Sequence, residues 1–269
     1  MSELKLAIAG ASGRMGRALL EAIASHPGAR VVAALDAPGA ASIGRDAGEY
    51  GTAGRGLKVS SDIAAALAAS DTLIDFTRPG GTLAHLAACR KAGKSMVVGT
   101  TGFEAAELQA LREGARDVPI VFAPNFSIGV NVSLRLVALA SKALGADYDV
   151  EVFEMHHKLK VDAPSGTALK LGEVAAVARG TSLEKDGVFA RHGVTGERKA
   201  GTIGFSVARG GDIIGDHTVY FAGAGERIEI THRSQSRATY AQGALRAAAW
   251  LAGKPAGLYD MADVLGLKA

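Results

Sequence analysis

The sequence predicts an α/β protein, with a parallel-sheet domain followed by a second, α+β domain. Three observations predict this fold. Short apolar segments alternate with segments of helical spacing over about the first 125 residues. A glycine-rich turn joins the first apolar segment to the first helical one. From residue 201 the pattern becomes turn-rich and strand-like, which is typical of antiparallel sheet.

The N-terminal elements follow the order strand, helix, strand. Residues 4–9 are apolar, residues 17–23 have helical apolar spacing, and residues 31–35 form a second apolar segment. Because these strands are apolar on both faces, they indicate a parallel sheet covered by helices on each side. Further strands are predicted at residues 72–76, 95–99 and 119–123, with helices at 84–92 and 104–116.

The turn after the first strand has three glycines with different tasks. Gly10 permits the tight turn, Gly13 allows backbone N–H groups to approach a pyrophosphate, and Gly16 allows close helix packing. Asp36 ends the second strand, where a ribose-binding acid is expected. The pattern predicts a Rossmann-type domain that binds a dinucleotide. The alternatives are that the glycines only form a turn and bind no ligand, and that Asp36 is only an exposed acid at a strand end.

Polar segments also follow three later strands, at residues 76–79, 99–102 and 123–127. Ligands of open α/β sheets lie outside the carboxyl ends of the strands, so these segments are candidate cofactor contacts. Polar loop starters and helix caps are the alternative interpretation.

The predicted second domain begins with a helix at residues 130–144 and a strand at 150–154. A polar loop at 156–162 and a helix that starts near residues 164–167 follow. Residues 203–207, 216–221 and 227–231 are expected to be antiparallel hairpin strands. The apolar, alanine-rich residues 240–251 predict a last helix.

The polar loop concentrates groups that transfer protons and bind anions. His156 and His157 are adjacent, Lys160 follows, and a helix N-terminus near Ser165 supplies N–H groups suited to a carboxylate. A zinc site is a competing interpretation, but no cysteine and no acid at ligand spacing support it. An ordinary surface loop is the third interpretation.

Composition excludes several classes of protein. Hydrophobic residues at 48% and charged residues at 21% argue against disorder. The net charge of +3 comes from scattered lysines and arginines, so no nucleic-acid partner is expected. The single cysteine, Cys89, is expected to be a buried apolar residue and allows no disulfide. No leader pattern and no apolar run of about 18 residues is visible, which predicts a cytoplasmic protein without a membrane partner.

Several of these motifs together resemble those of the 4-hydroxy-tetrahydrodipicolinate reductase family, bacterial enzymes of the diaminopimelate route to lysine. The most specific is the run from Glu154 to Ala168, which contains His156-His157-Lys158-Leu159-Lys160 and Pro164-Ser165-Gly166-Thr167. The others are Gly10-Ala11-Ser12-Gly13-Arg14-Met15-Gly16, Asp75-Phe76-Thr77, Gly99-Thr100-Thr101-Gly102, Asn125-Phe126-Ser127, His217-Thr218-Val219 and Ser236-Arg237. The resemblance spans nearly the whole chain.

The resemblance implies a nicotinamide-binding domain from residues 1–126 and 240–269, and a domain for substrate binding and tetramerisation from 127–239. It implies His156 as general acid/base and Lys160 as proton donor, leaving open which of them delivers the proton. His157, Gly166 and Thr167 match substrate-binding positions. The matching cofactor contacts are Gly10, Ala11, Ser12, Gly13, Arg14, Met15, Asp36, Gly99, Thr100, Thr101, Ala123, Pro124, Asn125 and Phe126.

One position departs from some family members, which carry an arginine just after the ribose-binding acid. This chain has Ala37 there, so only Arg14 remains as a partner for the 2′-phosphate of NADPH. Asp36 would repel that phosphate, and NADH is therefore predicted to be preferred over NADPH.

The expected activity is the reduction of a small cyclic dicarboxylate with loss of water; which group assists that loss stays open. Another two-domain NAD(P)-dependent dehydrogenase of amino acids or hydroxy acids is one alternative. A non-catalytic NAD-sensing protein is the other, although it would not need the proton-transfer groups of residues 156–167. A homotetramer is expected from the resemblance, and the residues predict no resident metal.

Overall fold

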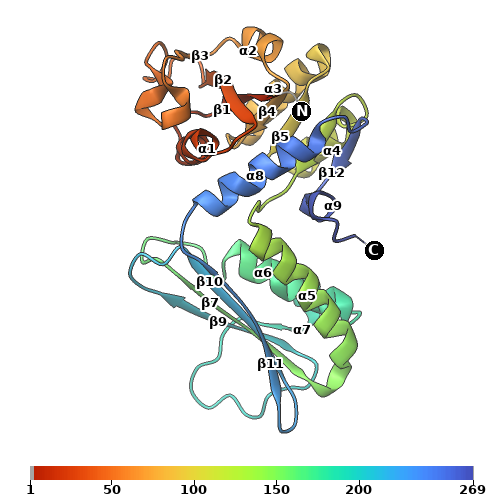
Figure 1. The fold of residues 1–269 in the computed structure, drawn as a ribbon. Coiled ribbons are helices and arrows are strands. Elements are labelled where there is room, and N and C mark those ends of the chain that lie inside the picture. The colour runs from red at the N-terminus through yellow and green to blue at the C-terminus, as the bar shows by residue number, and fades with distance from the viewer. Residues whose placement is uncertain (1–2, 269) are drawn as a thin grey trace. The chain divides into compact units, whose positions relative to one another are not determined.

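The computed structural model describes residues 3–268 and divides into two compact units (Figure 1). Unit 1 consists of Met1–Ile128 and Arg237–Ala269, and unit 2 of Gly129–Ser236. The chain therefore leaves unit 1, builds all of unit 2, and returns to unit 1 for its last elements. The sequence-based boundaries lie two residues earlier at the first crossing and three residues later at the second.

Unit 1 contains a seven-stranded parallel sheet in the order β12-β6-β5-β4-β1-β2-β3. Strand β1 pairs with β2 on one side and with β4 on the other, so the direction of winding reverses there. The strands are β1 (Leu4–Ala9), β2 (Ala29–Leu35), β3 (Val59–Ser60), β4 (Thr72–Asp75), β5 (Ser95–Val98), β6 (Pro119–Phe122) and β12 (Gly257–Tyr259).

Helices cover both faces of this sheet because side chains alternate along each strand. Leu6 and Ile8 of β1 pack in one core with residues of α1 and α8, whereas Ala7 and Ala9 pack in the other with α2, α3 and α4. The parallel α/β fold predicted from the sequence is confirmed. The helices are α1 (Arg14–Ala24), α2 (Ile63–Ala69), α3 (Pro79–Ala92), α4 (Ala105–Gly114), α8 (Ala238–Leu251) and α9 (Met261–Leu265), with short 3-10 turns η1 (Ala47–Glu49) and η2 (Thr52–Gly54).

Cys89 of α3 is fully buried in the second of these cores, as expected. Burial raises the pKa of its thiol to about 12. The thiolate is the reactive form of cysteine, so this side chain acts only as a small apolar residue.

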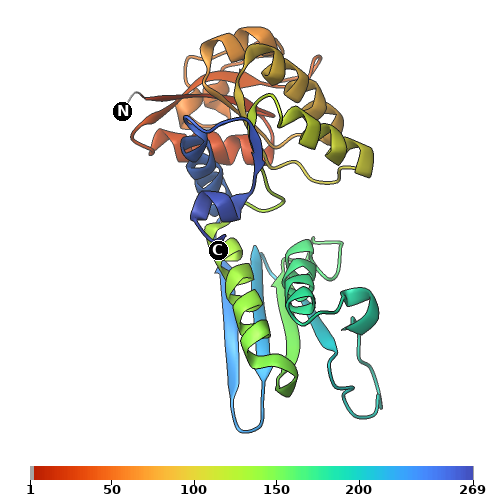
Figure 2. The ribbon, with the colours of Figure 1, turned by 90° about the vertical axis from the view of Figure 1, so that its right-hand side faces the viewer.

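Unit 2 is a five-stranded sheet in the order β11-β10-β7-β9-β8, with the long helices α5 and α6 on the same face (Figure 2). Val150 and Val152 of β7 and Phe221 of β10 pack against these helices. The elements are α5 (Ile128–Leu144), η3 (Gly145–Asp147), β7 (Asp149–His156), α6 (Gly166–Ala178), α7 (Leu183–Asp186), β8 (Gly187–Val188), β9 (Ile203–Arg209), β10 (Gly215–Ala222) and β11 (Arg227–Ser234).

The predicted run of antiparallel hairpins in unit 2 is only partly correct. Strands β10 and β11 do form an antiparallel hairpin, and β10 also runs antiparallel to β7. Strand β9, however, pairs parallel to β7 and does not neighbour β10. Alternation of apolar residues identifies a strand but carries no information about its partner, because side-chain direction is the same in parallel and antiparallel pairs.

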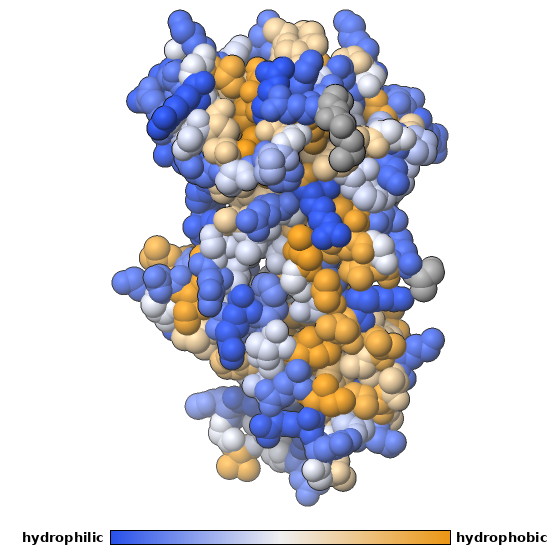
Figure 3. Space-filling model, in the orientation of Figure 1, coloured by the Kyte–Doolittle hydropathy of each residue, from blue (hydrophilic) through white to orange (hydrophobic). Residues whose placement is uncertain are grey.

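Helix α5 with the following turn η3, from Ile128 to Asp147, is long and apolar enough, by length and composition alone, to cross a membrane. Asn131, Ser133 and Arg135 interrupt its apolar residues, which is why the sequence shows no continuous run of that length. Val137 of this helix packs on the sheet of unit 2, while Leu139 on another face is 64% exposed. Figure 3 shows apolar residues gathered over α5.

Candidate active site

The turn between β1 and α1 has the geometry of a phosphate cradle. Gly10 has a φ of +71°, which other residues rarely adopt. A Cβ on Gly16 would lie 2.2 Å from the carbonyl oxygen of Gly10, and one on Gly13 would lie 3.1 Å from the same atom. Gly13 is also the N-cap of α1 and offers no side-chain cap, so backbone N–H groups of the first turn are left for an anionic ligand. These residues fit a dinucleotide pyrophosphate.

Asp36 is hydrogen bonded to this turn. Its Oδ2 atom accepts hydrogen bonds from the Ser12 N–H, at 3.2 Å, and from the Ser42 hydroxyl, at 2.6 Å. Ser42 is itself buried. The carboxylate is therefore held in place beside the glycine turn, as a ribose-binding acid must be. Ser42 was not among the predicted site residues, and only its place six residues after Asp36 in a turn-rich loop distinguished it.

The strand ends of β4 and β5 are joined by the buried carboxylate of Asp75. Its Oδ1 atom accepts from the N–H and hydroxyl of Thr77, at 2.8 and 2.6 Å, and from the Thr100 hydroxyl at 3.3 Å. Its Oδ2 atom lies 2.7 Å from Nδ1 of His85 on α3. Asp75 thus aligns two of the loops that were predicted to contact the cofactor.

The other predicted contacts in unit 1 differ in their exposure. Thr101 and Pro124 are exposed, whereas Ala123 and Phe126 belong to the core. The Phe126 ring packs edge-on against Phe76, and a Cβ on Gly99 would lie 2.0 Å from that Phe76 ring. Gly99 is therefore required for packing, independently of any ligand.

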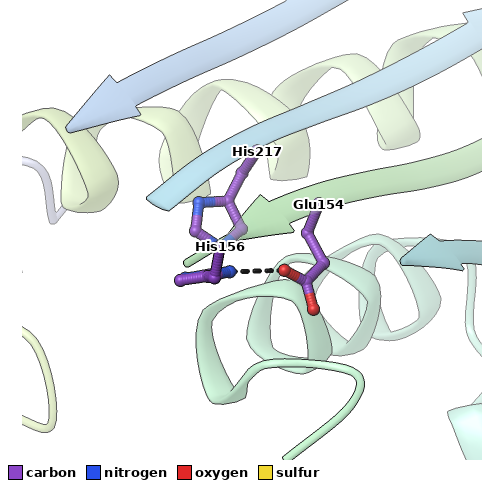
Figure 4. A group of neighbouring side chains, drawn as sticks. All are labelled: Glu154, His156 and His217. Carbon is purple, nitrogen blue, oxygen red and sulfur yellow. Dashed lines mark hydrogen bonds and ion pairs between the residues drawn. The ribbon is translucent and has the colours of Figure 1, made fainter. Parts of the chain in front are cut away.

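In unit 2, Glu154 and His156 lie on the same face of β7, two residues apart, and His217 of β10 lies beside them (Figure 4). The Glu154 side chain is completely buried, and its Oε2 atom is hydrogen bonded to Nδ1 of His156. The rings of His156 and His217 meet edge to face, with centroids 5.0 Å apart. This is a buried carboxylate–imidazole pair with a second imidazole against it.

The remaining positions around Glu154 are filled by fixed donors. Arg209 of β9 donates to both carboxylate oxygens, at 3.0 and 2.9 Å, and the Ser165 N–H donates to Oε1 at 3.0 Å. Two parallel bonds from a guanidinium are a strong and directional way to hold a carboxylate. Glu154 therefore accepts four hydrogen bonds, from three residues.

Burial acts on both members of the pair. It raises the pKa of Glu154, but the bonds from Arg209, His156 and Ser165 outweigh it, so the pKa of Glu154 lies below its ordinary value. Burial lowers the pKa of His156, and Glu154 opposes that shift. The pKa of His217 falls to about 4, mainly because of burial, so His217 is neutral near pH 7.

The loop after β7 carries Lys160 and His157. The Lys160 Nζ atom donates to both carboxylate oxygens of Asp162, at 2.8 and 2.9 Å. His157 is anchored by its backbone N–H to the Ile213 carbonyl, and its Nδ1 atom is buried without a hydrogen-bond partner among residues 3–268. The cation of Lys160 is thus already paired within its own loop.

Helix α6 begins at Gly166, with Ser165 as its N-cap. The Ser165 hydroxyl accepts from the Ala168 N–H at 3.1 Å and also contacts Nε2 of His217 at 3.1 Å. Gly166 and Thr167 lie in the first turn, at the positive end of the helix dipole. The N-cap therefore links the start of α6 to Glu154 and His217.

The side chains of Glu154, His156 and His217 also lie within ion-binding distance, with one ligand atom of each inside 4.8 Å. No acid at ligand spacing was expected from the sequence, but Glu154 supplies one. The same carboxylate already accepts two bonds from the Arg209 guanidinium, a cation that competes with a metal ion for it. The arrangement suits proton transfer better than metal binding.

Two partners of His156, namely Glu154 and His217, were given no role by the sequence-based prediction. Glu154 and His217 appeared only within motifs of the family resemblance. Alternation along β7 places residues 154 and 156 on one face, a signal that points to their pairing. Arg209 lies 55 residues from Glu154 in the sequence, and only the parallel pairing of β7 with β9 brings the two together.

Comparison with known proteins places the whole chain in one family. The family model described as "Dihydrodipicolinate reductase, N-terminus" matches residues 4–126, and the model described as "Dihydrodipicolinate reductase, C-terminus" matches residues 129–265. A relative named 4-hydroxy-tetrahydrodipicolinate reductase from Aromatoleum aromaticum is 59% identical over all of this chain and 97% of its own length. A relative of the same name from Cupriavidus metallidurans is 58% identical, covering 98% of this chain and all of the relative.

Solved structures show the same fold at lower identity. A dipicolinate-bound dihydrodipicolinate reductase from Paenisporosarcina sp. TG-14 is 23% identical, has a TM-score of 0.76, and covers 96% of this chain and 97% of its own. GenD2 from gentamicin A biosynthesis, solved with NAD, is 14% identical with a TM-score of 0.59, covering 95% of this chain and 88% of its own.

Proposed function

The chain belongs to the dihydrodipicolinate reductase family, and we propose that it reduces 4-hydroxy-tetrahydrodipicolinate to tetrahydrodipicolinate in the diaminopimelate route to lysine. The balanced reaction consumes substrate, NAD(P)H and one proton, and yields product, NAD(P)⁺ and water. The observation that carries the proposal is the buried pair of Glu154 and His156 in unit 2, in a chain whose unit 1 holds a dinucleotide cradle. The sequence-based assignment to this family, and to oxidoreductases, is confirmed by the relatives.

Unit 1 would hold the nicotinamide dinucleotide, which supplies the hydride when bound. The first turn of α1 would receive the pyrophosphate, and Asp36 the adenine-side ribose. A fixed carboxylate suits the ribose hydroxyls of NADH and repels the 2′-phosphate of NADPH, and Ala37 offers no compensating cation. We therefore propose that NADH is preferred and that NADPH is accepted more weakly, with Arg14 as the partner of its phosphate.

Unit 2 would bind the two carboxylates of the substrate. Lys160, once exchanged from Asp162 to the substrate, supplies a cation, and the first turn of α6 at Gly166 and Thr167 supplies N–H groups. His157 is the third proposed contact to the substrate carboxylates. Because each of these groups lies on the loop or the helix that follows β7, the substrate ring would lie next to His156.

His156 would supply the proton. Hydride addition leaves an anionic, enamine-like centre, which must be protonated to give the product. The imidazolium Nε2–H is the donor atom, because Nδ1 faces Glu154. Lys160 then acts mainly through its charge, by binding the substrate carboxylate.

The test is a coupled assay in which the purified chain receives freshly generated substrate and NADH, and the fall in NADH absorbance is followed. One NADH should be oxidised for each tetrahydrodipicolinate formed. Absence of NADH and NADPH oxidation by a folded protein that binds the cofactor would contradict the proposed reaction.

We also expect a cytoplasmic homotetramer. In unit 2 the two long helices cover one face of the sheet, and Phe153 on the other face is 37% exposed, which supports assembly through that face. Light scattering should give about four times the chain mass of 27.4 kDa. A solution mass near that of one chain would contradict the tetramer without affecting the proposed reaction.

A further inference from the structure

We propose that Glu154 is the positioning residue of this reaction: by accepting the Nδ1–H of His156, it makes Nε2 the atom that delivers the proton. The inference rests on the proposed role of His156 and adds a residue that acts through it.

The paired strands around Glu154 and His156 fix the direction of both side chains. Both residues lie on β7, which is hydrogen bonded to β10 on one side and to β9 on the other. Strand alternation points residues 154 and 156 to the same face, where the hydrogen bond from Nδ1 to Oε2 joins them. The ring of His156 is thus oriented by a partner that cannot move away.

Glu154 is held as an anion. Arg209 donates to both of its oxygens and Ser165 donates to one. These donors need lone pairs of the carboxylate and leave no room for a proton on it. Glu154 therefore stabilises the His156 imidazolium without taking its proton.

Gly215 lies beside the Nε2 atom of His156. A Cβ added at Gly215 of β10 would lie 2.9 Å from the His156 Nε2 atom. Real Cβ atoms essentially never lie under 3.0 Å from a neighbouring atom, so a side chain at residue 215 would require the ring or its surroundings to shift. Glycine at this position leaves room for the His156 ring where it stands.

The other charged and titratable groups around His156 also act on its pKa. Burial lowers the pKa of His156 most, Glu154 raises it, and Lys160 and Arg209 lower it further as nearby cations, so the pKa lies below its ordinary value. His217, in ring contact with His156, has a pKa of about 4 and contributes no charge near neutral pH. Glu154 is thus the group that opposes the lowering of the His156 pKa.

The proton balance follows from this geometry. The imidazolium carries Nδ1–H toward Glu154 and Nε2–H toward the substrate. Transfer of the Nε2 proton to the anionic centre leaves neutral His156 with Nδ1–H still bonded to Glu154, which is the tautomer that the carboxylate favours. A proton from water then restores Nε2–H for the next cycle.

The decisive experiment measures kcat and KM against pH for the intact enzyme and for Glu154→Gln, with His156 titrated in parallel by ¹⁵N NMR. We expect kcat to fall tenfold to a hundredfold, with little change in the NADH KM, as is usual for weakened general-acid catalysis. Because His156 must be protonated and loses an anionic partner, the high-pH limb of kcat should move to lower pH. Glu154→Asp, which keeps the charge, should restore part of the activity.

Glu151→Gln is the matched control, because Glu151 lies on the same strand and is also paired with arginines, Arg191 and Arg198. It should leave the pH limb unchanged. If Glu154→Gln does not fold, Gly215→Ala carries the test: it should lower kcat by displacing the ring while Glu154 stays ionised.

Two outcomes separate the inference from the proposed function. A folded Glu154→Gln enzyme with unchanged kcat and pH profile, alongside an inactive His156→Ala enzyme, would overturn the role of Glu154 alone. Normal turnover by His156→Ala would instead remove the proposed role of His156, and the inference with it. Wild-type kcat in a Gly215→Ala enzyme whose structure shows the His156 ring displaced would contradict the assignment of Nε2 as the donor atom.

Discussion

Asp75 in unit 1 and Glu154 in unit 2 are both completely buried carboxylates hydrogen bonded to Nδ1 of a histidine, yet their other partners differ in kind. Asp75 is surrounded by the hydroxyls of Thr77 and Thr100 and by a backbone N–H. Glu154 accepts two hydrogen bonds from the charged guanidinium of Arg209.

This difference indicates what each pair can do. Asp75 ends β4 and bonds to the ends of two loops, so it fixes their shape at the edge of the sheet where a cofactor is expected. Glu154 lies within a strand and has a permanent cation, so it remains ionised while its histidine changes protonation. The first pair organises backbone, and the second prepares an imidazole for proton transfer.

The largest expected effect is a difference in kcat between variants of the two histidines, His156 and His85. His156→Ala should lower kcat on the order of a hundredfold or more, as loss of a general acid does, with NADH binding retained. His85→Ala should lower kcat only a few-fold, because His85 supports a loop. Stopped assays give kcat, and nicotinamide fluorescence gives the NADH affinity. Equal losses in the two variants would remove the functional distinction between the pairs.

A second prediction concerns acid stability and His217. Its folded-state pKa of about 4 lies below its unfolded value of 6.5, so the unfolded chain binds more protons between these pH values. The contribution of neutral His217 to the free energy of unfolding should therefore be fully present above about pH 6.5 and should fall by about 3 kcal/mol as the pH drops to about 4. Amide hydrogen exchange in β7 and β10 measures it. His217→Phe should flatten the dependence between pH 7.5 and 5, and an unchanged slope would show that burial of His217 is not its cause.

A smaller effect is expected from Asp75→Asn. The amide replaces a charged acceptor and directs an NH₂ group toward hydrogen-bond donors, which should destabilise unit 1 by about 1–3 kcal/mol. If Asp75 organises the cofactor edge, the NADH dissociation constant should also rise, while the pH profile of kcat stays in place. Urea unfolding followed by Trp250 fluorescence reports on unit 1, where this tryptophan lies. A shifted pH profile would assign Asp75 a role in proton transfer after all.

The smallest effect concerns the choice of nicotinamide. Asp36→Ala should narrow the preference for NADH, and Ala37→Arg should narrow it further by about tenfold, through a charge-assisted contact to the 2′-phosphate. The ratio of kcat/KM for the two cofactors measures the change. Ser42→Ala, which removes a hydrogen bond to Asp36 but no charge, is the matched control and should raise the NADH KM without favouring NADPH. A clear NADPH preference in the unmodified protein would contradict this account of Asp36.

Local patterns in the sequence were sufficient for several features of the fold. Apolar residues 4–9 and the glycine turn identified β1 and the start of α1, because a strand buried on both faces and a positive φ each restrict composition at neighbouring positions. Short elements such as β3, β8, β12 and α9 were not predicted, since two to five residues carry too little periodicity to distinguish strand or helix from loop.

The sequence by itself determined the family, the α/β class and the loop that carries His156 and Lys160, because these depend on residues close together in the chain. The tertiary structure decided which groups act on them. It pairs β9 parallel to β7 and so brings Arg209 to Glu154, and it places His217 of β10 against His156. Such contacts join residues about 55 to 61 positions apart, and they arise from strand order and burial, which no local pattern encodes.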